Sequence, residues 1–283
     1  MSRSTAVPLI WYKFESLSTS KVQNFGSAGV SLDATLQNGA SVISIESPTG
    51  STCLNLSNTG SKLTNDPTGQ YLSIPPFTFG GAFSCSCWFK IANVQQWTSV
   101  YSFSLLNGAK SLSLCLSTNG QLVLRDYNHA ENFLNTNGTN YCDNKWHHVV
   151  VVSTGSTLAI FIDYKEVKLS DKVALDYAAI ENVERMNNYI GSSAFIDAYA
   201  TIQVDDFRLY TTAINDYDIQ ALYNYKKTPE TKKETKKETK KWNTNTIILI
   251  VVIVVVIFVV AMLILRNHRS VITPPHHARI VSR

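Results

Sequence analysis

Short runs of residues typical of β-strands follow one another between residues 7 and 225, and in several of them apolar and polar residues alternate. They include SVISI, CLNLS, FSCSCWFKI, TSVYSFSL, SLSLCLS, QLVLRDY, HHVVVVS, LAIFID and QVDDFRLY, with Gly, Asn and Ser between them. A hydrophobic period of two indicates β-strands that have one face in a core. Many strands at regular spacing predict a sandwich or a barrel, so we expect an all-β domain over residues 7–225.

Two segments predict tight hairpins in this domain. In STNGQ, residues 117–121, Asn119 and Gly120 both tolerate positive φ, so we expect them to be the two central residues of the turn. STGST, residues 153–157, is expected to connect the valine-rich strand to LAIFID in the same way.

The last predicted strand, VDDFRLY, contains two adjacent acids. Simple alternation places Asp206 and Arg208 on one face with Val204, where they form an ion pair, and places Asp205 and Phe207 on the other face. The segment after it, INDYDIQALYN, predicts a short helix that closes the domain. Its expected cap is Asn215 or Asp216, and its apolar face contains Ile219, Leu222 and Tyr223.

Adjacent histidines in KWHHVVVV are a pattern that also occurs in metal sites. Neighbouring side chains of a strand point to opposite faces, so His147 and His148 cannot bind one metal from a single face. We expect one histidine on each face, each hydrogen-bonded to a neighbour. Similarly, Cys85 and Cys87 share a face with phenylalanines and are expected to be buried. The five cysteines lack CxxC spacing, so neither a disulfide framework nor a zinc site is expected.

Residues 246–265, TIILIVVIVVVIFVVAMLIL, contain no charge, Gly or Pro. As a helix they would measure about 30 Å, the thickness of a bilayer core. This run is predicted to be a transmembrane helix that serves only as an anchor, because it contains no ionisable residue. Residues 1–6 are expected to be a short extension, and MSRSTAVPLIWYKF contains no apolar stretch of the length that a signal peptide needs.

The segments that flank the apolar run are basic. Residues 226–245 contain a TKKE repeat and are predicted to be a charged, partly helical linker whose lysines also contact anionic lipid. Residues 266–283 form a short basic tail. Seven lysines in 227–241 against four arginines after 265 favour a cytosolic large domain. Residues 7–225 contain 12 Lys and Arg against 18 Asp and Glu, so the domain itself is acidic and no nucleic-acid partner is expected.

Six motifs in this order resemble a laminin-G-like, concanavalin A-like jelly-roll domain. They are WYKFE, FSCSCWFK, KWHHVVVV, LAIFIDYKEV, YIGSS and VDDFRLYTTAINDYDIQALYN, and together they cover nearly all of residues 7–225. Two positions differ from the family pattern, because Tyr164 stands where a turn glycine is usual and Asp206 where Glu is common. The resemblance implies an antiparallel β-sandwich of the kind that serves lectins, adhesion modules and some glycoside hydrolases.

Candidate chemistry in the domain is sparse. The acid cluster of the related glucanases, Glu-x-Asp-x-x-Glu, does not occur, so no catalytic residue is assigned. A polar loop, RDYNHAENFLNTNGTNY, offers Tyr127, Asn128, His129 and Asn132 for sugar hydroxyls and stacking, although a solvated loop without a partner is the preferred interpretation.

The resemblance also implies a structural Ca²⁺ in some family members. Its ligands would come from NFGSAGVSLDA, in which Asp33 is the candidate and Asn24 stands where an acid is usual. No other cofactor is expected. Asn55 and Asn137 begin N-x-Ser/Thr sequons, which would be glycosylated only if the domain were lumenal.

Three functions fit these observations. The first is a virion membrane or structural protein that docks a protein partner, because a domain without a signal peptide on a carboxy-terminal anchor resembles membrane proteins of large DNA viruses. On such a particle the domain would face the capsid or the exterior. The second is a glycan-binding adhesin for host-cell attachment, and the third, less favoured, is a glycoside hydrolase.

Overall fold

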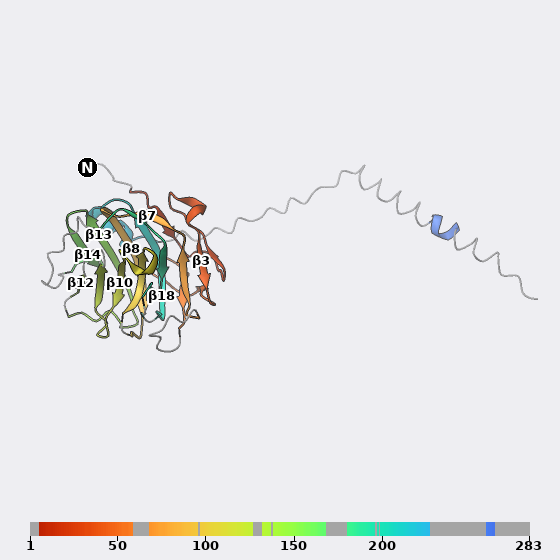
Figure 1. Ribbon diagram of the computed structural model, residues 1–283. Helices are drawn as coiled ribbons and strands as arrows, with labels where there is room; N and C mark the ends of the chain where they lie inside the picture. Colours follow the sequence, from red (N-terminus) through yellow and green to blue (C-terminus); the bar gives the residue numbers. More distant parts are fainter. Residues whose placement is uncertain are drawn as a thin grey trace, which may run out of the picture. The chain divides into compact units, whose positions relative to one another are not determined.

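The computed structural model describes residues 6–58, 68–95, 97–126, 132–136, 138–167, 180–195, 197, 199–226 and 259–263. The chain divides into two compact units, Met1–Pro229 and Glu230–Arg283. The first unit is built from two large antiparallel sheets (Figure 1).

Sheet A has eight strands, in the order β15-β14-β13-β8-β18-β5-β4, and β1 also pairs with β18. Their bounds are β1 Ile10–Tyr12, β4 Ser41–Ser44, β5 Thr52–Leu56, β8 Ala82–Ile91, β13 Trp146–Thr154, β14 Leu158–Ile162, β15 Lys165–Glu166 and β18 Ile202–Tyr210.

Sheet B has eight strands in the order β12-β11-β10-β9-β17-β6-β3-β2. Their bounds are β2 Lys21–Val22, β3 Ala34–Gln37, β6 Tyr71–Ile74, β9 Thr98–Ser104, β10 Leu112–Leu116, β11 Leu122–Asp126, β12 Asn132–Asn135 and β17 Asn187–Ile190. A two-stranded sheet pairs β7, Phe77–Phe79, with β16, Val183–Arg185. Two 3₁₀ turns, Gly29–Leu32 and Leu106–Gly108, lie in connections.

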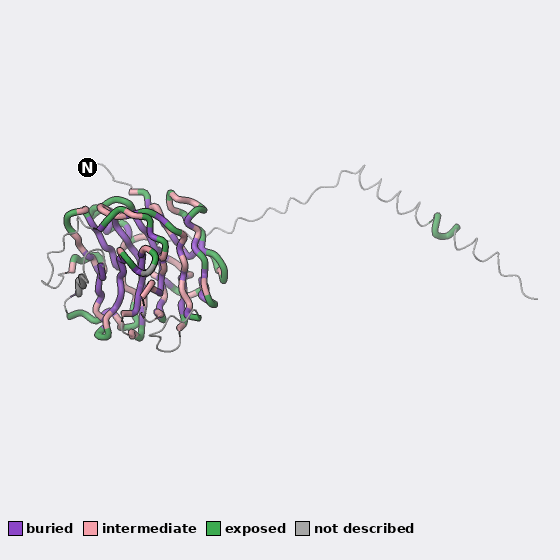
Figure 2. Tube along the Cα trace, viewed as in Figure 1, coloured by how far each residue is buried: buried purple, intermediate pink, exposed green. Residues whose placement is uncertain are grey.

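The hydrophobic core takes one face of each large sheet. Phe83, Cys85, Cys87 and Phe89 of β8 are all buried in it, as the alternation predicted. Figure 2 shows buried segments along the strands and exposed ones at the connections. The all-β antiparallel sandwich predicted from the sequence is confirmed.

The hairpin between β10 and β11 differs from the prediction. The N–H of Gly120 donates to the carbonyl of Ser117 at 2.8 Å, so the turn spans Ser117 to Gly120. Gly120 has φ +72°, but Asn119 is not among the residues with positive φ. The two-residue turn with both residues at positive φ was therefore wrong, because the turn is one position longer and places only its glycine in the left-handed region. The β13–β14 hairpin turns at Gly155, φ +90°, as predicted.

Strand β18 also departs from simple alternation. Its register against β8 shifts between Asp205 and Arg208, and Asp206 has φ +49°. Val204 therefore lies in the core together with Phe207, although alternation placed them on opposite faces. The physical reason is a β-bulge, located where β18 changes its neighbour from β5 to β1. The predicted ion pair of Asp206 with Arg208 is confirmed, at 2.9 Å between Oδ2 and Nη2.

Helix α1, Asp216–Tyr223, closes the outer face of sheet A. Asn215 caps it, since its side chain accepts the N–H of Asp218 at 3.0 Å while the carboxylate of Asp218 accepts the backbone N–H of Asn215 at 3.4 Å. Ile219 and Leu222 are buried against that face, and the Tyr223 ring stacks on Trp88 at 5.4 Å. Both the cap and the apolar face were predicted.

In the second unit, residues 259–263 are helical and exposed. Among the residues that the structure describes, no helix is both long and apolar enough to span a bilayer. The linker from 227, the rest of the predicted transmembrane run and the tail at 266–283 lie outside the described residues.

Candidate functional site

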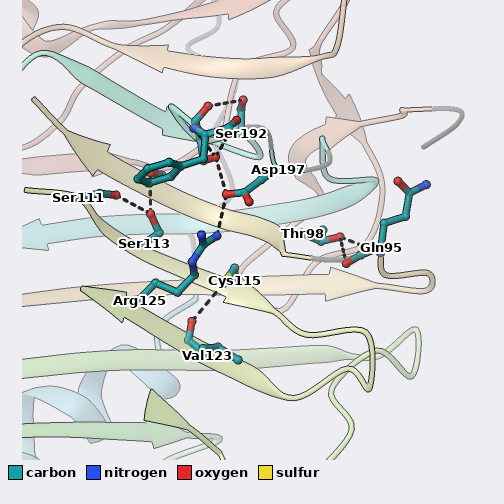
Figure 3. Close-up of polar contacts among 12 residues, drawn as sticks. Gln95, Thr98, Ser111, Ser113, Cys115, Val123, Arg125, Ser192 and Asp197 are labelled. Atoms are coloured by element: carbon teal, nitrogen blue, oxygen red, sulfur yellow. Dashed lines mark hydrogen bonds and ion pairs between the residues drawn. The ribbon is translucent and has the colours of Figure 1, made fainter. Parts of the chain in front are cut away.

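The outer face of sheet B, opposite its core face, has a floor of small polar side chains. Ser102 of β9, Ser113 of β10 and Arg125 of β11 lie opposite one another in neighbouring strands. All three are buried, although the core takes the other face of these strands. Ser113 donates to Ser102 at 2.7 Å and shares a hydrogen bond of 3.0 Å with Ser111 (Figure 3). The floor is therefore a connected row of hydroxyl groups.

A buried ion pair lies over one end of this row. Nη1 of Arg125 donates to Oδ2 of Asp197 at 2.8 Å, and both side chains are at most 6% exposed. Asp197 lies in the connection from β17 to β18, and the hydroxyl of Ser193 donates to the same oxygen at 2.7 Å. Figure 3 shows the Arg125 side chain reaching across the sheet toward Asp197. The pair thus joins β11 to a loop that crosses the outer face.

Two aromatic rings flank the guanidinium of Arg125. Its Cζ lies 4.9 Å from the ring centre of Trp97 and 5.4 Å from that of Phe195. Trp97 has φ +59°, and a short turn holds it, because the N–H of Gln95 donates to Thr98 at 2.9 Å and the Thr98 hydroxyl donates back at 3.0 Å. A cation between two ring faces is stabilised electrostatically when it is removed from water.

A second row of the floor contains Ser99 and Cys115, which lie opposite each other. The Ser99 hydroxyl is buried and has no hydrogen-bond partner among the described residues. Burial raises the pKa of the Cys115 thiol to about 12, with the charge of Arg125 opposing that shift. This thiol is therefore protonated at neutral pH and is not a nucleophile.

Three tyrosines extend the same face toward the other edge of the sheet. Tyr189 of β17 lies opposite Ser102, and its ring meets that of Tyr71 edge-on at 5.3 Å. Tyr71 stacks on Tyr199 at 6.1 Å and 15°. The Tyr199 ring lies against the backbone of Gly69, where an added Cβ would come within 2.1 Å of it. All three rings are half-buried, so each keeps some surface for a partner.

The arrangement is suited to binding. Half-exposed rings beside hydroxyl groups and one fixed ion pair resemble the mixed apolar and polar lining of sites for small polar ligands. Asp197, the carboxylate on this floor, is neutralised by Arg125 and accepts a hydroxyl, so it is not available as a proton donor or nucleophile.

Only the two ends of the predicted polar loop are among the described residues. It is the connection of the β11–β12 hairpin, and Asn132 is the first residue of β12, paired with Asp126. Tyr127, Asn128 and His129 lie outside the described residues. Sequence reasoning missed Asp197, Trp97 and Phe195, and it treated Arg125 only as the start of the loop. A lone arginine among apolar strand residues was the available signal, but Asp197, 72 positions away, gave none.

The two residues considered for calcium do lie together. Asn24 is buried, its Oδ1 accepts the N–H of Trp11 at 2.7 Å and of Gly26 at 2.9 Å, and its amide donates to two backbone carbonyls. Oδ1 of Asp33 accepts the N–H of Asn24 at 2.8 Å. Calcium usually takes two or more carboxylates and several further oxygens. Here the neutral amide of Asn24 already donates to the carbonyls of Leu9 and Gly29, so the geometry fits a loop held by an amide and not a cation site.

Of the two sequon asparagines, Asn55 lies on β5 and accepts a hydrogen bond from Gln203 at 3.4 Å, whereas Asn137 lies outside the described residues. Within the described part of the chain, no group of three or more His, Cys, Asp or Glu is placed to hold a metal ion.

The paired histidines occupy the two faces of β13, as predicted. His148 is buried on the outer face and shares a hydrogen bond of 3.0 Å with Ser86. Burial lowers its pKa to about 3, with a smaller opposing effect of Asp163. His147 lies between Asp163, at 2.9 Å, and Asp143, at 3.1 Å, and the hydrogen bond to Asp163 raises its pKa. Both histidines therefore form hydrogen bonds that connect parts of the fold.

Comparison with protein families identifies the sandwich. The sequence profile of the concanavalin A-like lectin/glucanases superfamily matches residues 66–220. The match covers more than half of the chain and includes strands of both large sheets. The chain belongs to this family. The resemblance stated from six sequence motifs is thereby confirmed. No curated protein matches the chain in sequence.

Solved structures share the fold of this superfamily member at low identity. Domain 4 of AbnA, an extracellular arabinanase from Geobacillus stearothermophilus in complex with arabinotriose, aligns with a TM-score of 0.57 and 12% identity, over 77% of this chain and 98% of that one. The binding domain of Paraclostridial Mosquitocidal Protein 1 aligns at 0.54 and 12%, over 77% and 52%. The binding domain of botulinum neurotoxin DC, in complex with rat synaptotagmin II, aligns at 0.52 and 16%, over 77% and 51%. The chain thus spans about half the length of the toxin binding domains it matches.

Proposed function

We propose that this superfamily member is a non-enzymatic module that recognises carbohydrate on the outer face of sheet B. The observation that carries the proposal is the combination of three half-buried tyrosines with the hydroxyl floor and the Arg125–Asp197 pair on that one face. Aromatic rings stack on the apolar faces of sugars, and fixed polar groups orient the hydroxyls. AbnA domain 4, which shares the fold, holds arabinotriose.

A binding role is favoured over glycoside hydrolysis by the state of the acids. Hydrolysis needs two carboxylates about 5–10 Å apart with separate roles. Asp197 is tied to Arg125, and on the opposite sheet Asp206 is buried and paired with Arg208. Neither carboxylate is placed to protonate a leaving group.

The test is a glycan array probed with the protein and with its variants. Tyr71→Ala and Tyr199→Ala should abolish binding to the neutral glycans that the parent protein retains. Tyr217→Ala is the matched control, because Tyr217 is an exposed tyrosine on α1, which packs on the other sheet. Equal loss in all three variants would contradict the proposed face.

The proposal includes a membrane tether and a place on a virion membrane, with the domain on its cytosolic, capsid-facing or outer side. Its support is the uncharged run at 246–265 and the seven lysines that precede it. Deleting 243–265 should release the protein from carbonate-washed membranes. Protease protection of intact particles should leave the domain accessible from the predicted side, and a mobility shift on endoglycosidase treatment would overturn that sidedness.

Docking of a protein partner is the second candidate function. The observation that favours it is the exposure of three large apolar side chains in the amino-terminal part of the domain, Val7, Phe25 and Val30, which are 69%, 44% and 78% exposed. The neurotoxin DC domain, of the same fold, binds synaptotagmin II. A blank glycan array would favour this function, and Phe25→Ser with Val30→Ser should then abolish binding of the partner, whereas Leu17→Ser should not.

A further inference from the structure

A second polar pocket lies on sheet A, on the other side of the molecule's core from the tyrosines. Its volume is about 170 Å³, and it lies where β5, β18 and β8 run side by side. Its polar lining comes from Asn55, Ser57, Lys90, Asn144, Thr201 and Gln203. Sites for drug-sized ligands measure about 300–1,000 Å³. This pocket therefore suits one small unit, alone or at the end of a longer chain.

Strand register aligns the groups that give the pocket its chemistry. Asn55 of β5 lies opposite Gln203 of β18, which lies opposite Lys90 of β8, which in turn lies opposite Trp146 of β13. These residues alternate with core residues on their strands, so all four share the outer face of sheet A. Two amides, one ammonium and a half-exposed indole thus form a single row across four strands.

The charge of the pocket has one sign. Lys90 is half-buried and forms no ion pair within the described part of the chain, and no Asp or Glu lines the pocket. A cation that has lost part of its water and has no counter-charge attracts an anion more strongly than a fully solvated one. The pocket therefore selects a ligand with a negatively charged group.

Gln203 adds a second requirement. Its Oε1 is buried and has no hydrogen-bond partner among the described residues, while its amide donates only a long hydrogen bond of 3.4 Å to Asn55. A buried acceptor without a donor costs free energy, which a donor from a ligand or water would recover. A ligand hydroxyl can donate this hydrogen bond to Oε1 of Gln203.

We infer that this pocket is a second binding site, specific for a carboxylated sugar. The carboxylate pairs with Lys90, and a ring hydroxyl donates to Gln203. The inference rests on the proposed function for its ligand class, but it uses a different sheet and different residues. Asn55 is also a sequon acceptor, so a glycan attached there would occupy the same space.

The test uses protein made in bacteria, which adds no N-glycan, and measures glucuronate and glucose binding by ligand-observed NMR. The parent protein should bind glucuronate more tightly than glucose. Lys90→Met should weaken glucuronate binding about tenfold or more, as expected for a hydrogen bond to a charged group. Lys90→Arg should retain most of the binding, because it keeps the charge.

Two controls separate this site from the site on sheet B. Lys165→Met removes an exposed lysine of the same sheet and should leave binding unchanged. Tyr71→Ala and Tyr199→Ala should likewise have no effect on glucuronate. If these tyrosine variants abolish glucuronate binding and Lys90→Met does not, the second site is overturned while the proposed function stands. If the parent protein binds no glucuronate, the inference is overturned, and the glycan array decides the proposed function by itself.

Discussion

The two outer faces of the sandwich share one device, a buried arginine–aspartate pair whose guanidinium lies between two aromatic rings. On sheet A, Arg208 pairs with Asp206 and lies 4.2 Å from the Trp11 ring and 4.4 Å from the Tyr225 ring. On sheet B, Arg125 pairs with Asp197 between Trp97 and Phe195. The two pairs differ in the sequence separation of their members, because Asp206 is two residues from Arg208 whereas Asp197 is 72 residues from Arg125.

The Asp206–Arg208 pair is therefore a local contact, whereas the Arg125–Asp197 pair, which we call the clasp, connects two segments that are distant in the chain. The pair on sheet A forms within one strand, at the bulge of β18, and the indole of Trp11 donates to the same carboxylate at 2.7 Å. The pair on sheet B holds the β17–β18 connection across the hydroxyl floor, so it determines the shape of the candidate carbohydrate site. We therefore expect disruption of the sheet B pair to affect binding as well as stability.

The largest predicted effect comes from breaking the clasp. Arg125→Met should lower the free energy of unfolding by about 3–5 kcal/mol, because it leaves the carboxylate of Asp197 buried without a counter-charge. Arg125→Met with Asp197→Leu should recover most of that loss. Lys110→Met, which breaks the more exposed Lys110–Glu181 pair, should cost less than about 1 kcal/mol. Urea unfolding measures all three, and equal losses for Arg125→Met and Lys110→Met would contradict the clasp.

The second prediction concerns pH and the outer face of sheet A. His148 is buried there with a pKa of about 3, so the unfolded chain binds its proton first as pH falls below about 6.5. Its contribution is fully present above that pH and is lost on acidification, at about 1.4 kcal/mol per pH unit at most. His148→Asn should flatten this loss in urea unfolding series between pH 8 and 4.

His147, on the other face of the same strand, should behave in the opposite way. Its pKa is raised by the hydrogen bond to Asp163, so its contribution is fully present at low pH and is lost as pH rises through the folded pKa. His147→Gln should therefore remove a loss on the alkaline side. A parent protein whose stability does not change with pH, together with unchanged slopes in both variants, would show that neither histidine has the environment described.

A smaller effect is expected at the turn after β14, beside helix α1, which covers part of the outer face of sheet A. Tyr164 has φ +64°, where a glycine is usual in the family, and its ring stacks on Tyr223 at 6.4 Å. Tyr164→Gly and Tyr164→Ala both remove the ring, but only alanine retains the backbone strain. Thermal or urea unfolding should find the glycine variant more stable by about 1 kcal/mol. The reverse order would show that the left-handed conformation is not populated.

The smallest effect compares the rings that cover the two arginines. Tyr225→Leu and Phe195→Leu each keep apolar contact but remove a ring from beside a guanidinium, which we expect to cost about 0.5–1 kcal/mol. Phe195→Leu should also weaken binding on sheet B, whereas Tyr225→Leu should leave it unchanged. Equal effects on binding would remove the functional distinction between the two faces.

Much of the fold follows from local pattern. Short β-type runs bounded by turn residues located nine strands, among them β8, β13 and β18, and i, i+3, i+4 spacing located the face of α1. The Asp206–Arg208 pair was predictable because residues two apart on a strand share a face. Alternation failed at irregularities in the strands. The bulge that moves Val204 into the core depends on β1 and β5 meeting β18 in succession. A register shift between β9 and β10 likewise places the adjacent residues Val100 and Tyr101 both in the core.

The sequence by itself determined the strands, their buried faces, the family and the basic, apolar character of the carboxy-terminal segment. Tertiary structure alone decided which distant residues meet. The pairing of Arg125 with Asp197, the contact of Tyr71 with Tyr199 and the row from Asn55 to Trp146 each join segments far apart in the chain. The physical reason is that alternation says which face a side chain is on, whereas strand order and register decide what lies next to it.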